Sequence, residues 1–187
     1  KNMDFVKRFP YLTEKARNNL LTKYKYVGTD ESFFSKILDP FWELCAKSLP
    51  ARIAPNTVTA LGFVGVVIAV GIVLLYNPTL DGGAQTPSWV YLLAAFLLFY
   101  YQTMDAIDGK HARNTKSSSA LGELFDHGLD ALTTMCQTLI IISTLQLGAT
   151  YWSVACMFLI YVTSYLVIWE DYVTDELRFG VFNSPTE

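Results

Sequence analysis

The sequence predicts an all-α membrane protein, a bundle of about four transmembrane helices preceded by an amphipathic interfacial helix. Three observations predict this fold class. The chain of 187 residues is 52% hydrophobic, above the apolar share of an ordinary soluble domain. Its uncharged stretches are long enough to cross a bilayer, and its charged residues are distributed very unevenly.

The first two spans follow from the first long uncharged stretch and the apolar run after it. No charged residue lies between Arg52 and Asp81, and residues 57–76 supply the 20 residues that a hydrocarbon core of about 30 Å accepts as one helix. Proline and glycine at 77–88 indicate a turn. The second span covers residues 89–104, and its helix is expected to continue past the membrane edge to Arg113.

Two further spans follow a polar connection at residues 114–119. Residues 131–169 contain no charge, and these 39 residues are too many for one span but enough for two. Gly148 permits a turn at 146–150. We therefore expect the third span at about 121–145 and the fourth at 151–169.

The basic residues predict the orientation of the bundle. Ten of the fourteen Lys and Arg residues lie at or before Arg52, and the remaining four follow the second or the fourth span: Lys110, Arg113, Lys116 and Arg178. The positive-inside rule places both termini and the second loop in the cytoplasm. We expect a cytoplasmic N-terminal region at 1–52, a transmembrane domain at 53–170 and a cytoplasmic tail at 171–187.

An amphipathic helix is predicted at residues 32–49, before the first span. Its apolar residues recur three or four positions apart: Phe33, Phe34, Ile37, Leu38, Phe41, Trp42 and Cys45. Aromatic and basic content favours a helix lying under the lipid headgroups. The alternative is a helix that packs on another part of the protein.

Four aspartates carry the clearest chemical signal. Asp105 and Asp108 are three residues apart, and Asp126 and Asp130 are four apart, so each pair occupies one face of its helix. Ionisable residues at membrane depth usually serve a function. Four carboxylates repel one another unless a cation neutralises them, and oxygen ligands favour Mg²⁺, Mn²⁺ or Ca²⁺ over zinc. Such ions recruit diphosphate oxygens and leave phosphorus open to attack.

Small and basic residues next to the aspartates fit that use. Gly109 and Ala112 remove bulk beside the first pair, Gly122 does so before the second, and Arg113 offers planar donors to phosphate. Each also has a structural explanation, since glycine serves close helix packing and arginine anchors a span at the cytoplasmic side.

Together these residues form a pattern that resembles the complete signature of the CDP-alcohol phosphotransferases. It reads Asp105-x-x-Asp108-Gly109-x-x-Ala112-Arg113, eight residues, then Gly122-x-x-x-Asp126-x-x-x-Asp130. The segments at 54–59, 122–128 and 169–172 resemble the eukaryotic choline and ethanolamine phosphotransferases. The similarity extends from about Lys23 to Glu187.

The resemblance implies an activity, a site and partners. The hydroxyl of diacylglycerol would attack the phosphorus next to the amino-alcohol of a CDP-alcohol, releasing CMP and forming phosphatidylcholine or phosphatidylethanolamine. Asp105, Asp108 and Asp126 would bind two Mg²⁺ or Mn²⁺ ions, with Asp130 completing the site and acting as the base. Residues that would hold the nucleotide are Gly109, Ala112, Arg113 and Gly122, with Asn56 facing it. A homodimer in the endoplasmic reticulum or Golgi and no nucleic-acid partner are expected.

His127 is a second candidate for the proton acceptor, because imidazole titrates near neutral pH. His111 points a different way around its helix. The family core has six spans, so four spans predict a catalytic domain that is partial. Other interpretations are another CDP-alcohol phosphatidyltransferase, a non-catalytic partner, an intramembrane prenyltransferase and a cation transporter. The transporter is disfavoured because the carboxylates gather at one membrane side.

Overall fold

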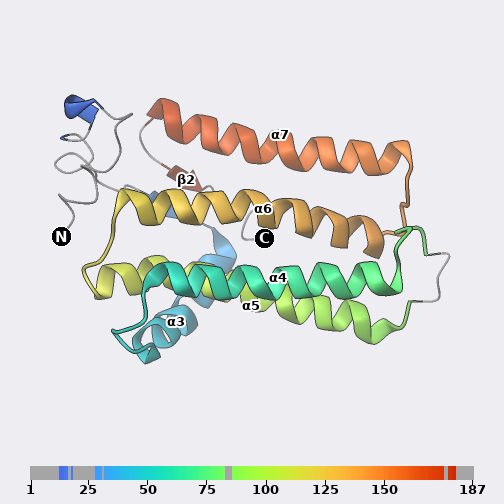
Figure 1. Cartoon of the computed structure of the whole chain (residues 1–187), viewed down its shortest axis with the longest axis horizontal. Helices are drawn as coiled ribbons and strands as arrows, with labels where there is room; N and C mark the ends of the chain where they lie inside the picture. The colour runs from blue at the N-terminus through green and yellow to red at the C-terminus, as the bar shows by residue number, and fades with distance from the viewer. Residues whose placement is uncertain are drawn as a thin grey trace.

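The computed structural model describes residues 13–16, 18, 28–30, 32–82, 86–174 and 177–179. Four long helices form most of it: α4 (Pro55–Tyr76), α5 (Ser88–Asn114), α6 (Ala120–Thr144) and α7 (Tyr151–Thr174). They run up and down beside one another, and their connections lie at alternate ends of the bundle (Figure 1). The predicted all-α fold is confirmed, and each predicted span matches one of these helices.

Three of the four helices, α4, α5 and α7, are long and apolar enough to cross a membrane. Helix α6 has 25 residues, but its first half carries Glu123, Asp126 and Asp130, which lower its hydropathy. The protein is therefore a membrane protein. The assignment of α6 as a further span remains a prediction, supported by its length and its alignment with α4.

Helices α4 and α5 approach closely because α4 carries glycine where they meet. A Cβ atom on Gly62 would lie 2.9 Å from Met104 Cβ, and one on Gly65 would lie 2.9 Å from Tyr100 Cδ1. Small residues of this kind let membrane helices pack backbone to backbone. In the half of the bundle beyond Gly65, the core consists of Ala69, Val70, Val73, Val90, Ala94 and Ile140.

Helix α3 (Phe33–Ser48) is the predicted amphipathic helix. Trp42 and Ala46 are buried in one cluster with residues of α4 and α5, and Lys110 Nζ of α5 lies 2.5 Å from Asp39 Oδ1. The other face remains exposed and apolar, with five residues between 43% and 66% exposed: Phe33, Phe34, Ile37, Phe41 and Leu44. The helix thus packs on the protein by one face, and its position at the membrane interface remains a prediction.

A short parallel sheet was not predicted. Strands β1 (Gly28–Asp30) and β2 (Leu177–Phe179) pair with Thr29 opposite Arg178. Segments of three residues are too short to show a periodic pattern in the sequence. Most of the predicted N-terminal region before β1 and of the tail after α7 lies outside the described residues, so the predicted domain boundaries remain predictions.

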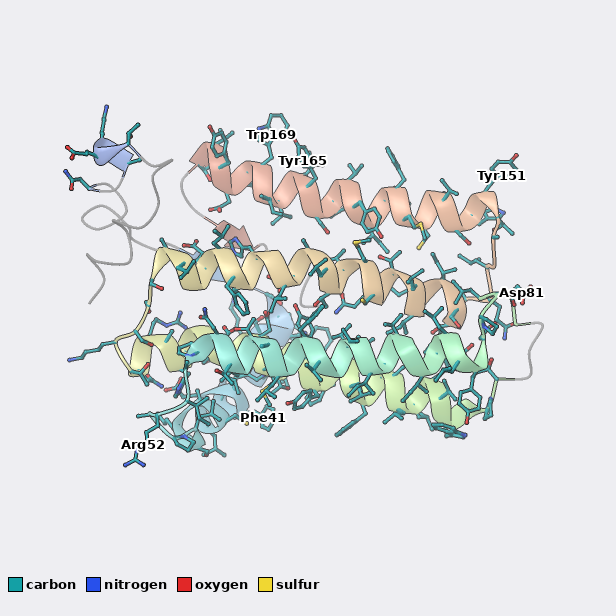
Figure 2. All side chains as sticks on the ribbon, in the orientation of Figure 1. Phe41, Arg52, Asp81, Tyr151, Tyr165 and Trp169 are labelled. Carbon is teal, nitrogen blue, oxygen red and sulfur yellow. The ribbon has the colours of Figure 1, made fainter. Side chains whose placement is uncertain are left out.

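Helix α7 is the least packed of the four long helices. It contacts α6 and β2, and Ser153 is its one buried residue among those that the structure describes. Figure 2 shows Tyr151, Tyr165 and Trp169 pointing away from the other helices. The functional site must therefore be sought between α4, α5 and α6.

Candidate metal centre

The structure brings the predicted aspartates together at one end of the bundle. Asp105 and Asp108 lie on α5, and Asp126 and Asp130 lie on α6. Oxygen atoms of Asp105, Asp108 and Asp126 all lie within 4.8 Å of one another. Asp130 is outside this group of three, and it lies four residues after Asp126 on the same side of α6.

The carboxylate oxygens are suited to a cation. Asp105 Oδ1 and Asp126 Oδ1 are buried, and neither has a hydrogen-bond partner in the structure. A buried carboxylate without a partner is strongly destabilising unless a positive charge lies beside it. A divalent metal ion would supply that charge and would accept the oxygen ligands that are present. The group of three aspartates could therefore hold a metal ion.

The other two aspartates have hydroxyl partners on neighbouring helices. Thr59 Oγ1 of α4 donates to Asp108 Oδ2, in a buried contact. The Tyr101 hydroxyl of α5 donates to Asp130 Oδ1 over 2.5 Å. Hydrogen bonds of this kind orient a carboxylate in a metal site.

The contacts of Thr59 and Tyr101 with the aspartates were not predicted from the sequence. Tyr101 lies four residues before Asp105, on the same side of α5, and this spacing could have marked it. Thr59 is the last polar residue before the apolar run of α4 that begins at Ala60. No sequence pattern, however, predicts which hydroxyl meets which carboxylate across a helix interface.

The residues predicted to bind the nucleotide lie at the same end of the bundle. A Cβ atom on Gly109 would lie 3.4 Å from Arg113 Nη1, and one on Gly122 would lie 3.4 Å from Asn56 Oδ1. Asn56, at the start of α4, is therefore next to the start of α6. Ala112 is half-buried and Arg113 is exposed. Their roles in binding remain predictions.

The two histidines have different surroundings. His127 is half-buried on α6, three residues before Asp130 and on the same side of the helix. His111 is 1% exposed, and its Nε2 donates to the Ile53 carbonyl over 2.9 Å. His111 thus joins α5 to the turn before α4, and only His127 is placed to take part in chemistry at Asp130.

The carboxylates do not extend along the bundle. No charged residue occurs between Asp130 and Glu170 in the sequence, and the polar side chains that the structure shows buried in the other half of the α4–α5–α6 core, such as Asn77, Thr138 and Ser143, are neutral. A path for ions through the membrane would need polar groups spaced through its thickness. The arrangement fits a site that binds a metal and its ligand at one end.

Comparison with known proteins agrees with the family resemblance of the aspartate motif. Residues 52–182 match the CDP-alcohol phosphatidyltransferase family. The chain is 40% identical over 178 residues to an uncharacterized CDP-alcohol phosphatidyltransferase class-I family protein 3 of Dictyostelium discoideum, covering 94% of this chain and 44% of that protein.

Relatives with assigned activities are equally similar. Choline/ethanolaminephosphotransferase 1 of Arabidopsis thaliana is 42% identical over 171 residues, 89% of this chain and 42% of that protein. Cholinephosphotransferase 1 of Saccharomyces cerevisiae is 41% identical over 178 residues, 95% of this chain and 44% of that protein. The chain thus spans less than half the length of each of these three relatives.

Proposed function

The chain belongs to the CDP-alcohol phosphatidyltransferase family, and we propose that the protein transfers phosphocholine or phosphoethanolamine from CDP-choline or CDP-ethanolamine to diacylglycerol. The products are CMP and phosphatidylcholine or phosphatidylethanolamine. The group of three aspartates, with two buried oxygens that lack partners, is the observation that carries the proposal. The names of the Arabidopsis and yeast relatives support the choice of substrates.

We assign the metal ligands from the positions of the carboxylates. Asp105, Asp108 and Asp126 would hold two Mg²⁺ or Mn²⁺ ions, and Asp130 would complete the site. Divalent ions bound there screen the charge of a diphosphate and leave its phosphorus open to attack. The two partner-free oxygens and the separation of at most 4.8 Å between ligand atoms support this assignment.

The transfer exchanges one phosphorus–oxygen bond for another. The diacylglycerol hydroxyl oxygen forms a bond to the phosphorus next to the amino-alcohol, while the bond from that phosphorus to the bridging oxygen breaks and CMP leaves with that oxygen. Asp130 takes the hydroxyl proton as general base. His127 is the alternative acceptor, because it lies three residues before Asp130 on the same side of α6 and neutral imidazole is a proton acceptor near neutral pH.

The remaining predicted residues bind the nucleotide. Gly109 and Gly122 leave the backbone open beside the carboxylates, Ala112 keeps the end of α5 small, and Arg113 donates to phosphate. Asn56 faces the same space from the start of α4. The distance of 3.4 Å between Asn56 Oδ1 and a Cβ atom placed on Gly122 supports the inclusion of Asn56.

We further propose that the site faces the cytoplasm of the endoplasmic reticulum or Golgi and that the protein forms a homodimer. Lys110, Arg113 and Lys116 lie beside the carboxylates in the chain, which supports the cytoplasmic orientation. Compartment and dimer are expectations from family resemblance.

The function can be tested with purified full-length protein in detergent micelles or liposomes. The substrates are diacylglycerol with either CDP-choline or CDP-ethanolamine, with Mg²⁺ or Mn²⁺, and the readout is CMP release with analysis of the lipid product. Asp126→Asn is the control, since it should lower Mn²⁺ binding and CMP release together. A protein that binds Mn²⁺ but releases no CMP would contradict the proposal, and release with a different lipid acceptor would reassign the substrate within the family.

A further inference from the structure

The hydroxyl of Tyr101 makes an unusual contact for a side chain in an apolar helix. Tyr101 is only 8% exposed, and its hydroxyl lies 2.5 Å from Asp130 Oδ1. A hydrogen bond from a neutral donor to a carboxylate is shorter and stronger than one between neutral groups. Because Tyr101 is on α5 and Asp130 is on α6, the bond also links the two helices that supply the acidic residues.

The ring of Tyr101 is itself held in place. It packs against α4, where a Cβ atom on Gly62 would lie 3.4 Å from Tyr101 Cδ2. The phenol is therefore fixed by a helix backbone rather than by a flexible side chain. Its hydroxyl can therefore hold the Asp130 carboxylate in a fixed orientation.

Asp130 is also the carboxylate that differs from the others. It is the one of the four aspartates that is not in the group of three with converging oxygens. Asp105 and Asp126 each have a buried oxygen without a partner, whereas Asp130 Oδ1 has the phenol. The contact occupies one Asp130 oxygen and fixes the orientation of the carboxylate.

We propose that Tyr101 is a positioning residue: its hydroxyl holds Asp130 in the orientation from which that carboxylate accepts the proton of the lipid hydroxyl. This inference rests on the proposed function. It assigns Tyr101 no contact with the substrate, so the effect of removing its hydroxyl must pass through Asp130. Misplacing a catalytic group by about 1 Å can lower a rate by about a hundredfold.

The test compares Tyr101→Phe with Tyr91→Phe in the full-length protein. Tyr91 is a matched control, since it lies on the same helix and its hydroxyl bonds to Ser143, away from the carboxylates. We expect Tyr101→Phe to lower kcat by about tenfold to a hundredfold and to leave the KM for the CDP-alcohol and the Mn²⁺ affinity within about twofold of wild type. Tyr91→Phe should leave all three unchanged.

A double variant separates positioning from a general loss of structure. In an Asp130→Asn background, Tyr101→Phe should lower kcat no further, because the carboxylate that Tyr101 positions has already been removed. A further fall of the same size would overturn the proposal, as would normal turnover by Tyr101→Phe or a loss of Mn²⁺ affinity that accounts for its lower turnover.

Failure of the proposed function would give a different result. A wild-type protein that binds Mn²⁺ but releases no CMP from either CDP-alcohol would overturn that function. The positioning contact would then be judged from melting temperatures of the two single variants and the double variant. Non-additive shifts would support the Tyr101–Asp130 link, and additive shifts would overturn it.

Discussion

The two ends of the α4–α5–α6 core both bury polar side chains, but the groups they bury differ in kind. At the end away from the aspartates, the Tyr91 hydroxyl donates to the Ser143 carbonyl over 3.2 Å, and Asn77 Nδ2 donates to Ser143 Oγ over 3.0 Å. All three side chains are neutral, and they come from the end of α4, the start of α5 and the end of α6. They join three helices.

The aspartate end buries charge. Tyr101 there satisfies one carboxylate as Tyr91 satisfies a serine at the other end, yet Asp105 and Asp126 keep buried oxygens without partners. A neutral unpaired oxygen such as Asn77 Oδ1 is a modest cost, whereas an unpaired carboxylate is a large one. The difference indicates that the hydrogen bonds among Asn77, Tyr91 and Ser143, which we call the clasp, are structural, and that the aspartate end could hold a cation.

The largest expected difference between the two ends is the side of the membrane on which each lies. Arg52 and Asp81 are at opposite ends of the bundle (Figure 2). Lys116 lies in the α5–α6 connection, at the aspartate end. Because Lys and Arg cluster around that end, we expect it to be cytoplasmic.

Single cysteines test this in a variant lacking Cys45, Cys136 and Cys156. In sealed microsomes with their cytoplasmic face outward, an impermeant maleimide should label Lys116→Cys at once and Asp81→Cys only after the membrane is opened. Labelling of both from the outside would contradict the spans as assigned. Equal labelling in detergent is the control for reactivity.

Within the aspartate end, replacing the proposed base Asp130 should have the largest effect on turnover. Asp130→Asn should lower turnover by about a hundredfold to ten-thousandfold while CDP-alcohol binding is retained, because an amide cannot accept the proton. Asp105→Asn should instead lower metal affinity, so higher Mg²⁺ should partly restore its turnover.

Titrations of turnover with Mg²⁺ distinguish the two roles. Recovery of Asp130→Asn at high Mg²⁺ would show that Asp130 acts as a metal ligand only and not as the base. Near-normal turnover of Asp130→Asn would make His127 the leading candidate for the base, and His127→Ala should then show the loss expected of Asp130→Asn.

The sequence predicted most of what separates the two ends, because charge and hydropathy vary along the chain itself. The helices could be placed from apolar runs, and the acidic pairs could be assigned to helix faces from their spacing. The hydrogen-bond partners across the helix interfaces could not be predicted. Tyr101 meets Asp130 and Thr59 meets Asp108 only at one rotation of each helix, and local periodicity does not determine relative rotation.

The close approach of α4 to α5 was missed for a related reason. Gly62 and Gly65 look like ordinary members of an apolar span, and their importance depends on Met104 and Tyr100 of the next helix. The short pairing of β1 with β2 was also beyond prediction, because it joins two brief segments that are far apart in the sequence.

The substitution Gly62→Ala on α4 should have an effect of intermediate size on stability and on Mn²⁺ binding. Gly62→Ala would place a Cβ atom 2.9 Å from Met104 Cβ, so α4 and α5 must move apart beside the aspartates. Overpacking of this kind costs about 1–3 kcal/mol of stability. We expect a lower melting temperature in detergent and weaker Mn²⁺ binding.

Gly71→Ala is the matched control, since nothing lies within 4 Å of its Cβ position. Its stability should stay within about 1 kcal/mol of wild type, the size of the helix-propensity difference between the two residues. Equal losses in the two variants would show that close packing at Gly62 is unimportant.

The smallest expected effect is at the clasp. Ser143→Ala removes the hydroxyl that accepts from Asn77 Nδ2, and hydrogen bonds between membrane helices contribute about 0.6 kcal/mol on average and up to about 1.7 kcal/mol. We expect a melting temperature a few degrees lower, with Mn²⁺ binding and turnover unchanged, because no atom of the clasp touches a carboxylate. Ser164→Ala on α7 is the control, since Ser164 Oγ donates to the Ile160 carbonyl of its own helix and should cost less. If Ser143→Ala weakened Mn²⁺ binding as Gly62→Ala is expected to do, the two ends would be energetically coupled, and the clasp could not be regarded as a purely structural element.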